Sequence, residues 1–222
     1  MLEHVSLPEA VARVLRHRIL NNEIPADSRL VEASLAADFG VSRGTIRDAT
    51  RALQAEGLIE IVPRRYSVVT RMSTEDAEDV CYARYVLEEA SVSRGLPHYG
   101  SELAKELQAA IEAMAAAVQA NDLDALVESD TRFHEQLVDA SGRHRLKQLW
   151  STLNSQMGAV LRSEIERRGV SPSGAVQSHR EVFDAVIAGD SKQLRAVLRE
   201  HYLAGFATWR PEPGAGAESD SR

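Results

Sequence analysis

Apolar residues in the first 70 positions recur at spacings that predict three helices followed by a β-hairpin. Amphipathic spacing indicates helices over residues 8–21, 30–39 and 42–56, and alternation indicates strands over 58–61 and 67–70. Gly40 and Val41 suit a tight turn, and Ser42 can cap the third helix by accepting a backbone N–H. A helix, a turn and a capped helix, followed by a hairpin, predict a winged helix-turn-helix over residues 1–71.

The third of these helices divides its residues between two faces. Four apolar residues are expected to point inward: Ile46, Ala49, Ala52 and Leu53. The outward face offers these candidate DNA contacts: Ser42, Arg43, Thr45, Arg47 and Arg51. Guanidinium forks and hydroxyls suit base edges in the major groove. Arg64 and Arg65, at the tip of the hairpin, are placed to reach phosphates or the minor groove. The alternative is a capped, arginine-rich surface helix without a ligand.

Beyond residue 72 the apolar spacing predicts helices only. Six are expected, over 73–98, 101–120, 123–140, 145–168, 173–188 and 191–209. The loops between them are short, which favours antiparallel neighbours packed as a bundle. Residues 211–222 are rich in Pro, Gly and acidic side chains and are expected to be disordered. The fold class is therefore mainly α: a winged helix-turn-helix domain (1–71) and an all-α six-helix bundle (72–210).

Four ionisable residues interrupt the apolar faces of three bundle helices. Asp130 and His134 lie one turn apart on the helix over 123–140, and His179 and His201 lie on the apolar faces of the last two helices. Each histidine taken alone is typical of a hydrogen-bonded core residue, but a buried carboxylate needs a partner. A divalent metal ion bound by all four supplies one. Three nitrogens and one oxygen suit zinc first, and also nickel, manganese or iron.

Arg84 is the candidate effector-binding residue. It lies on the apolar face of the first bundle helix and could offer a guanidinium fork to a carboxylate. The alternative is an ion pair with Glu88 one turn further along. A metal-dependent hydrolase fused to a DNA-binding domain was also considered. No second carboxylate or other base falls beside the metal ligands at helical spacing, so we expect no enzyme.

Charge separates the two halves of the chain. Residues 1–70 hold nine Arg and nine acidic residues, whereas residues 71–222 hold 17 basic and 24 acidic ones and account for the net charge of −7. A local cationic patch within the first 70 residues is therefore compatible with the negative net charge of the whole chain. The lone Cys81 is interpreted as a small buried hydrophobe, with redox sensing as the alternative. We see no signal peptide or membrane-length apolar run, so a cytoplasmic protein without membrane contact is expected.

The first 71 residues resemble the DNA-binding domain of the GntR family of bacterial transcription regulators. The resemblance is carried by the segments ILNNEIPADSRLVEASLAADFGVSR and IRDATRALQAEGLIE and by the hairpin. It implies that Arg65 makes a wing-tip contact and that the groove is read by Ser42, Arg43, Thr45 and Arg47. Three positions depart from the family pattern: Ala26 for a glycine, Gly44–Thr45 for Thr–Pro, and Tyr66 for the wing glycine.

The second half is similar to the FCD effector-binding domain of the FadR subfamily, and its six expected helices suggest the VanR-like branch. The matching segments are ARYVLEEASVSRG, ESDTRFHEQLVDASGRHRL, SHREVFDAVIAGD and LREHYLAG. The resemblance implies that the metal ligands are Asp130, His134, His179 and His201. It further implies a small carboxylate-bearing effector beside the metal and a homodimeric repressor on a pseudo-palindromic DNA operator. The alternative is a regulator for which the metal ion itself is the signal.

Overall fold

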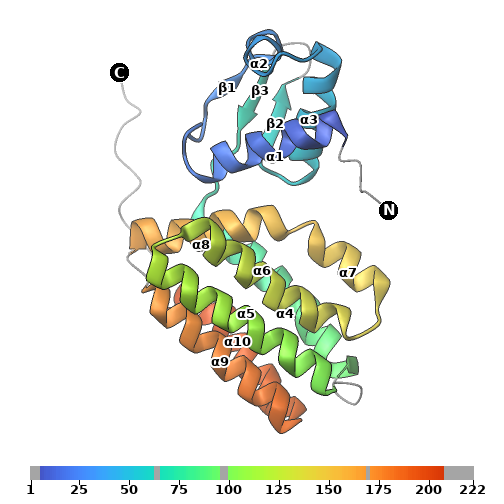
Figure 1. The fold of residues 1–222 in the computed structure, drawn as a ribbon, viewed down its shortest axis with the longest axis vertical. Helices are drawn as coiled ribbons and strands as arrows, with labels where there is room; N and C mark the ends of the chain where they lie inside the picture. The colour runs from blue at the N-terminus through green and yellow to red at the C-terminus, as the bar shows by residue number, and fades with distance from the viewer. Residues whose placement is uncertain (1–5, 63–65, 96–99, 169–170, 208–222) are drawn as a thin grey trace, which may run out of the picture.

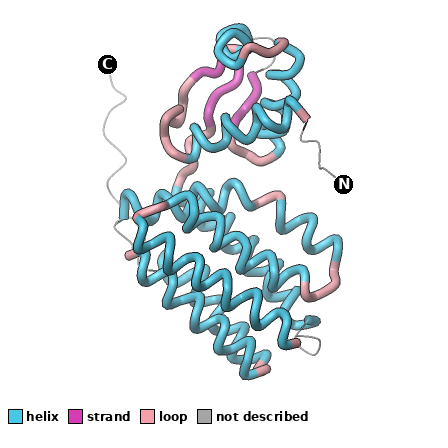
Figure 2. Tube along the Cα trace, in the orientation of Figure 1, coloured by secondary structure: helices cyan, strands magenta, loops and turns pink. Residues whose placement is uncertain are grey.

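The computed structural model describes residues 6–62, 66–95, 100–168 and 171–207. Its described part holds ten helices and three short strands, arranged as a small N-terminal domain, the head, above a larger helical bundle (Figure 1). The strands lie in the head, and the bundle is built from helices and loops (Figure 2). The prediction of a mainly α chain with an N-terminal winged helix-turn-helix is confirmed. No described helix is long and apolar enough to cross a membrane.

The head contains a helix-turn-helix backed by a three-stranded antiparallel sheet. Its elements are α1 (Leu7–Leu20), β1 (Arg29–Leu30), α2 (Glu32–Phe39), α3 (Arg43–Ala55), β2 (Ile59–Val62) and β3 (Tyr66–Val69), with strand order β1-β3-β2. Residues 30 and 31 were expected to begin a helix, but Arg29 pairs with Val68 and Leu30 with Ser67 in the sheet. A two-residue strand is too short to show alternation, so apolar Leu30 could be assigned to either element.

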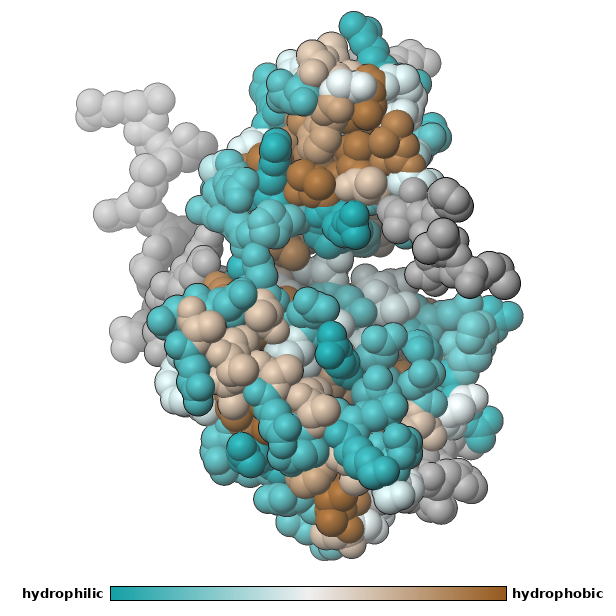
Figure 3. Space-filling model, viewed as in Figure 1, coloured by the Kyte–Doolittle hydropathy of each residue, from teal (hydrophilic) through white to brown (hydrophobic). Residues whose placement is uncertain are grey.

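Two residues that were expected to point into the core of the head, Ala52 and Val14, are exposed instead. Ile46, Ala49 and Leu53 are buried on α3, but Ala52 is exposed and Thr50 is buried instead. Ala52 lies about 120° around the helix from Ile46, outside the apolar stripe. On α1, helical spacing predicts an inward face of Val11, Val14, Leu15 and Ile19, yet the Val14 side chain is 40% exposed. Figure 3 shows apolar side chains gathered on the visible face of the head, whereas the bundle below is mostly hydrophilic there.

The described bundle contains seven helices where six were expected. They are α4 (Thr74–Gly95), α5 (Ser101–Ala120), α6 (Leu123–Asp139), α7 (His144–Ser151), α8 (Asn154–Arg168), α9 (Pro172–Ala188) and α10 (Ser191–Ala207). The expected helix over 145–168 is interrupted at Thr152 and Leu153. There the backbone N–H groups bond three residues back, and the Thr152 hydroxyl donates to the Leu149 carbonyl at 2.7 Å. Such side-chain bonds compete with the helical pattern.

Helix α5 packs along α6 and α9, and α10 packs along α4 and α9, so that their apolar faces meet in one core. Phe133 on α6 and Leu198 on α10 are fully buried in it. The expected helix ends at residues 98 and 209 lie outside the described residues, as does the tail over 211–222. The faces of α6, α9 and α10 that carry the ionisable residues therefore line the same interior.

Candidate metal centre and DNA-binding surface

Three histidine rings from three helices meet inside the bundle. His134 on α6 lies with its Nε2 atom 3.2 Å from Nε2 of His179 on α9 and 3.1 Å from Nε2 of His201 on α10. One ligand atom from each ring falls within 4.8 Å of the others. His134 and His179 are buried and His201 is partly buried. Helical spacing alone placed each ring on an inner face, and packing of the helices brings the three rings together.

The outer nitrogen of each ring has a partner of its own. His134 Nδ1 lies 2.8 Å from Glu88 Oε2, His179 Nδ1 donates to the Ala175 carbonyl at 2.7 Å, and His201 Nδ1 lies 3.2 Å from Ser178 Oγ. Because a carbonyl only accepts, the His179 ring carries its proton on Nδ1. If Nδ1 is the donor at all three rings, the three Nε2 atoms that face one another can share a cation, either a proton or a metal ion.

Asp130, one turn before His134 on α6, lies at the edge of this cluster. Its Oδ1 atom is 3.1 Å from His179 Nε2, and its side chain is only 11% exposed. Burial raises the pKa of the Asp130 carboxyl, but the hydrogen bond and charge of a proton on His179 Nε2, in the place that a metal ion would take, outweigh burial and hold the pKa well below its usual range. Burial together with the neighbouring imidazoles of His179 and His134 lowers the pKa of His201. Asp130 is therefore an anion, and the His201 ring is neutral.

The donor set fits a divalent transition metal. Two nitrogens bound to one tetrahedral zinc ion lie about 3.4 Å apart, because zinc–nitrogen bonds are about 2.0–2.1 Å long. The separations of 3.1 and 3.2 Å between the three Nε2 atoms are close to this value. Imidazole nitrogens with one carboxylate oxygen suit zinc, nickel, manganese or iron. The bonds at the three Nδ1 atoms are the supporting contacts that metal-binding histidines make in general.

A cavity of about 240 Å³ opens beside the histidines. One wall is apolar and comes from α8, through Met157, Val160 and Leu161. Ser178 and Tyr202 contribute hydroxyl groups on the side of α9 and α10. The cavity is large enough for a small organic molecule, and the expected metal ligands form part of its lining.

Arg84 does not line this cavity. Its side chain is fully buried behind the histidines, with its Nε 3.4 Å from Glu88 Oε1, its Nη1 donating to Asn154 Oδ1 at 2.8 Å and its guanidinium 4.0 Å from the centre of the Trp150 ring. The structure thus shows the ion pair with Glu88 that the sequence left as the alternative. Sequence reasoning named Glu88 only as that partner, and missed that it also faces His134.

Cys81 lines the same cavity but is only 2% exposed. Burial raises the pKa of its thiol to about 12, so almost no thiolate exists near neutral pH. We expect native Cys81 to react with iodoacetamide at pH 8 at least about tenfold more slowly than in urea-unfolded protein. The rate is expected to rise about tenfold per pH unit with no plateau below pH 11. Native alkylation as fast as that of unfolded chains would instead support the redox alternative.

The candidate DNA-binding residues gather at the start of α3. Ser42 Oγ caps the helix by accepting from Thr45 N–H at 3.1 Å, and the two hydroxyls lie 2.9 Å apart. Arg43, Arg47 and Arg51 are exposed, as the spacing predicted. Arg64 and Arg65 lie outside the described residues.

Two of these arginines have acidic neighbours. Arg47 makes two bonds to Glu32 on α2, at 3.1 and 2.8 Å, and Arg51 lies 3.6 Å from Asp48. The hydrogen bond from Arg47 lowers the pKa of the Glu32 carboxyl. Arg43 makes no ion pair within the described part of the chain. Arg43 is therefore ready for an external anion, whereas Arg47 must first release Glu32.

A winged helix-turn-helix with an exposed cationic helix, joined to a helical bundle that contains a histidine cluster and a cavity, defines the class of DNA-binding transcriptional regulators. Comparison with known families supports this assignment. Residues 7–69 match the family described as bacterial regulatory proteins, gntR family, and residues 79–204 match the FCD domain. The chain belongs to the GntR family and carries an FCD domain.

Relatives and solved structures agree with that placement. An uncharacterised HTH-type transcriptional regulator in an unstable DNA locus of Streptomyces ambofaciens is 31% identical over 196 residues, covering 86% of this chain and 80% of the relative. The gluconate operon transcriptional repressor of Bacillus licheniformis is 28% identical over 88% of this chain and 77% of its own length. The structure of Escherichia coli McbR/YncC shares the fold, with a TM-score of 0.75, 21% identity and coverage of 91% and 96%. The two sequence relatives are named as a transcriptional regulator and a transcriptional repressor, which confirms the expectation of a regulator rather than an enzyme.

Proposed function

We propose that this transcriptional regulator is a repressor whose operator affinity is controlled by a small carboxylate-bearing effector, bound beside a divalent metal ion in the bundle. One observation carries the proposal. The Nε2 atom of His134 lies 3.2 Å from that of His179 and 3.1 Å from that of His201, and the Nδ1 atom of each ring contacts another residue. In a hydrogen-bonded core without an ion, three facing lone pairs would repel one another. A buried cation removes that conflict.

In this proposal the four sequence-predicted residues hold the ion: Asp130, His134, His179 and His201. His179 and His201 each present a nitrogen from the neighbouring helices α9 and α10, while Asp130 supplies the negative charge. When bound, the ion offers open coordination positions to an anionic oxygen. Zinc is the first choice, with nickel, manganese and iron compatible with the same donors.

The cavity supports a carboxylate as the effector class. Among its described lining residues no lysine or arginine is present, so the ion would be the cationic anchor for an acid. The apolar wall from Met157 to Leu161 would contact the carbon chain. The Ser178 and Tyr202 hydroxyls donate to the Ala175 carbonyl and to Glu88, so they would accept from hydroxyl groups of the effector. One relative is named for the gluconate operon, and gluconate is a hydroxylated carboxylate.

The remaining parts of the proposal concern assembly. We expect a cytoplasmic homodimer, because two small heads on half-sites one helical turn apart gain affinity for a pseudo-palindromic operator. The head and bundle would be domains over 1–71 and 72–210. The VanR-like branch stays a prediction, since it rested on six helices and the described bundle has seven.

A melting screen of zinc-loaded protein against small organic acids tests the proposal. A binding acid should raise the melting temperature of wild type and change its affinity for an operator obtained by selection from random duplex DNA. The same acid should leave the zinc-treated His179→Ala variant unchanged. If zinc alone switches operator affinity and no acid adds to the change, the ion itself is the signal. Acid binding that persists in His179→Ala would contradict the metal-anchored site.

Glu32→Gln is expected to strengthen binding to DNA of any sequence. The change removes a negative charge beside the groove-facing helix and releases Arg47 from its two bonds to Glu32. Exposed ion pairs are weak, so we expect a rise of about two- to fivefold in affinity at low salt, and a steeper salt dependence. Fluorescence anisotropy with random-sequence duplex measures both. Glu128→Gln on α6, which removes an acid of the bundle that likewise pairs with an arginine, Arg132, is the matched control. Unchanged or weaker DNA binding would show that Arg47 does not reach DNA.

A further inference from the structure

A buried ion pair between Arg84 and Glu88 lies behind the candidate metal centre. Both side chains are fully buried. Besides facing His134, Glu88 accepts through Oε1 from the Trp150 indole N–H at 2.7 Å and from the Tyr202 hydroxyl at 2.6 Å. One carboxylate of α4 therefore joins the metal-facing histidine of α6 to α7 and α10.

The other half of the pair reaches α8. Arg84 stacks on Trp150 near the end of α7 and donates to Asn154, the first residue of α8. These two contacts fall on either side of the interruption at Thr152 and Leu153. We call residues 150–158 the α7–α8 junction. The Arg84–Glu88 pair therefore contacts both sides of the break between α7 and α8.

The junction is also one of the places where the bundle contacts the head, besides Asp124 of α6, which lies near His17 and Asn21 of the head. Ser155 Oγ donates at 2.6 Å to Glu56 Oε2, and Glu56 is the C-cap residue of α3, the candidate recognition helix. Glu56 in turn accepts from Arg16 Nε of α1 at 2.7 Å. Gly57 packs so closely on Gln156 that a Cβ atom there would lie 2.0 Å from Gln156 Nε2. A shift of the first turn of α8 would therefore change the contacts that Ser155 and Gln156 make with the end of α3.

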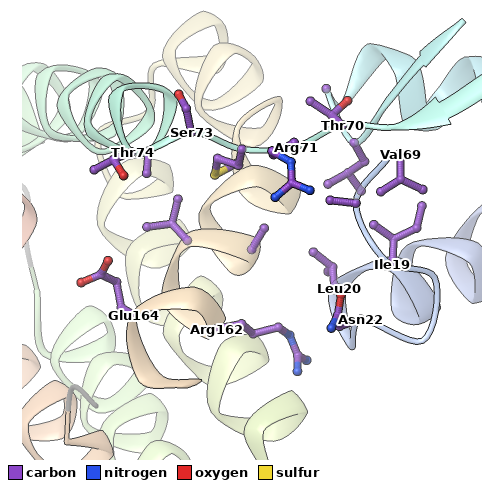
Figure 4. A pocket seen from close by; sticks show the side chains of 17 residues that line it. Ile19, Leu20, Asn22, Val69, Thr70, Arg71, Ser73, Thr74, Arg162 and Glu164 are labelled. Carbon is purple, nitrogen blue, oxygen red and sulfur yellow. The ribbon is translucent and has the colours of Figure 1, made fainter. Parts of the chain in front are cut away.

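Helix α8 further separates two cavities. A cavity of about 380 Å³ lies between head and bundle, with Ile19 and Leu20 of α1 on one side and Arg162 and Glu164 of α8 on the other (Figure 4). Glu164 lines this cavity and also the smaller one beside the histidines. The head-facing cavity leaves α8 room to move when the bundle changes.

We propose that the Arg84–Glu88 pair is a positioning device that relays occupation of the metal centre to the α7–α8 junction, and through Ser155 and Glu56 to α3. The inference rests on the proposed metal centre. When a metal ion holds the His134 ring at Nε2, the ring presents its Nδ1–H to Glu88 in one orientation. Metal-binding histidines in general donate their other N–H to a carboxylate or carbonyl in this way. Glu88 cannot then shift without breaking its bonds to Trp150 and Tyr202. The junction is thereby fixed in the metal-loaded state and freer without metal.

Hydrogen–deuterium exchange of the full chain, with and without saturating zinc, tests this relay. In wild type, zinc should slow amide exchange by about tenfold or more around His179 and over residues 150–158. Glu88→Gln and Asn154→Ala should keep the slowing around His179 and lose it over 150–158. Glu89→Gln, which changes the neighbouring and partly exposed glutamate of α4, should behave as wild type.

The outcomes separate the relay from the metal centre. If calorimetry detects no zinc binding to wild type, both proposals are wrong. If zinc binds but residues 150–158 are not slowed, or remain slowed in Asn154→Ala, the relay alone is wrong. Asn154→Ala leaves every bond of Glu88 and the histidines in place, so it decides the question even where Glu88→Gln fails to fold.

Discussion

Replacing His179 with alanine is expected to abolish high-affinity zinc binding. The substitution removes one of three facing Nε2 ligands and leaves Asp130 without its 3.1 Å partner. We expect the zinc affinity to fall by at least about 100-fold, since even supporting residues around metals contribute 10- to 100-fold. Zinc at 100 times its dissociation constant should stabilise wild type by about 2.7 kcal/mol and the variant by almost nothing. Calorimetric titration and thermal melts measure the two effects.

His144→Ala is the matched control for that experiment. His144 is an exposed histidine at the start of α7 and contributes no atom to the cluster. Its variant should bind zinc and gain stability as wild type does. Melting of His179→Ala without zinc establishes that the variant is folded. A folded His179→Ala protein with wild-type zinc affinity would contradict the assignment of this histidine.

Loss of Arg43 and Arg47 is expected to have the largest effect on operator binding. Both guanidinium groups project from the exposed first turns of α3, where forked donors recognise base edges. Each alanine variant should weaken operator binding by about 5- to 100-fold and relax base preference. Arg43→Ala should be the more severe, because Arg47 must break its two bonds to Glu32 before it reaches DNA.

Electrophoretic mobility shifts with a selected operator and with scrambled duplex measure that loss. Arg145→Ala, on the exposed start of α7, removes an arginine of the same size from the bundle and should leave the operator affinity unchanged. Operator binding by the Arg43→Ala/Arg47→Ala double variant at wild-type strength would show that α3 is not the recognition helix.

The head could be predicted closely because its signals are local. Ser42 caps α3 through its own neighbour Thr45, and Gly40, with φ of 64°, adopts the left-handed conformation that a glycine allows at a helix end. β1 was missed because its pairing with β3 joins residues about 38 positions apart, and two residues carry no periodic pattern. The exposure of Ala52 shows that small apolar residues mark a buried face poorly.

The candidate metal centre could be predicted only in part. Spacing placed Asp130 and His134 on one buried face of α6, and His179 and His201 on the apolar faces of α9 and α10. The need of a buried carboxylate for a partner suggested the grouping, and the resemblance reinforced it. What no spacing indicated is the second carboxylate: Glu88 meets His134 across 46 positions, through packing of α4 on α6. The same packing turns Arg84 away from the cavity and toward Asn154. These contacts depend on how helices cross, which apolar periodicity does not encode.

X-ray absorption spectroscopy at the zinc edge, on protein loaded with one equivalent of zinc, tests the central claim most directly. We predict a first shell of three imidazole nitrogens and carboxylate or water oxygen at about 2.0–2.1 Å, with the multiple-scattering signature of histidine rings. The His179→Ala sample should lose one imidazole. A first shell of oxygen alone, or one containing sulfur from Cys81, would contradict the three-histidine centre.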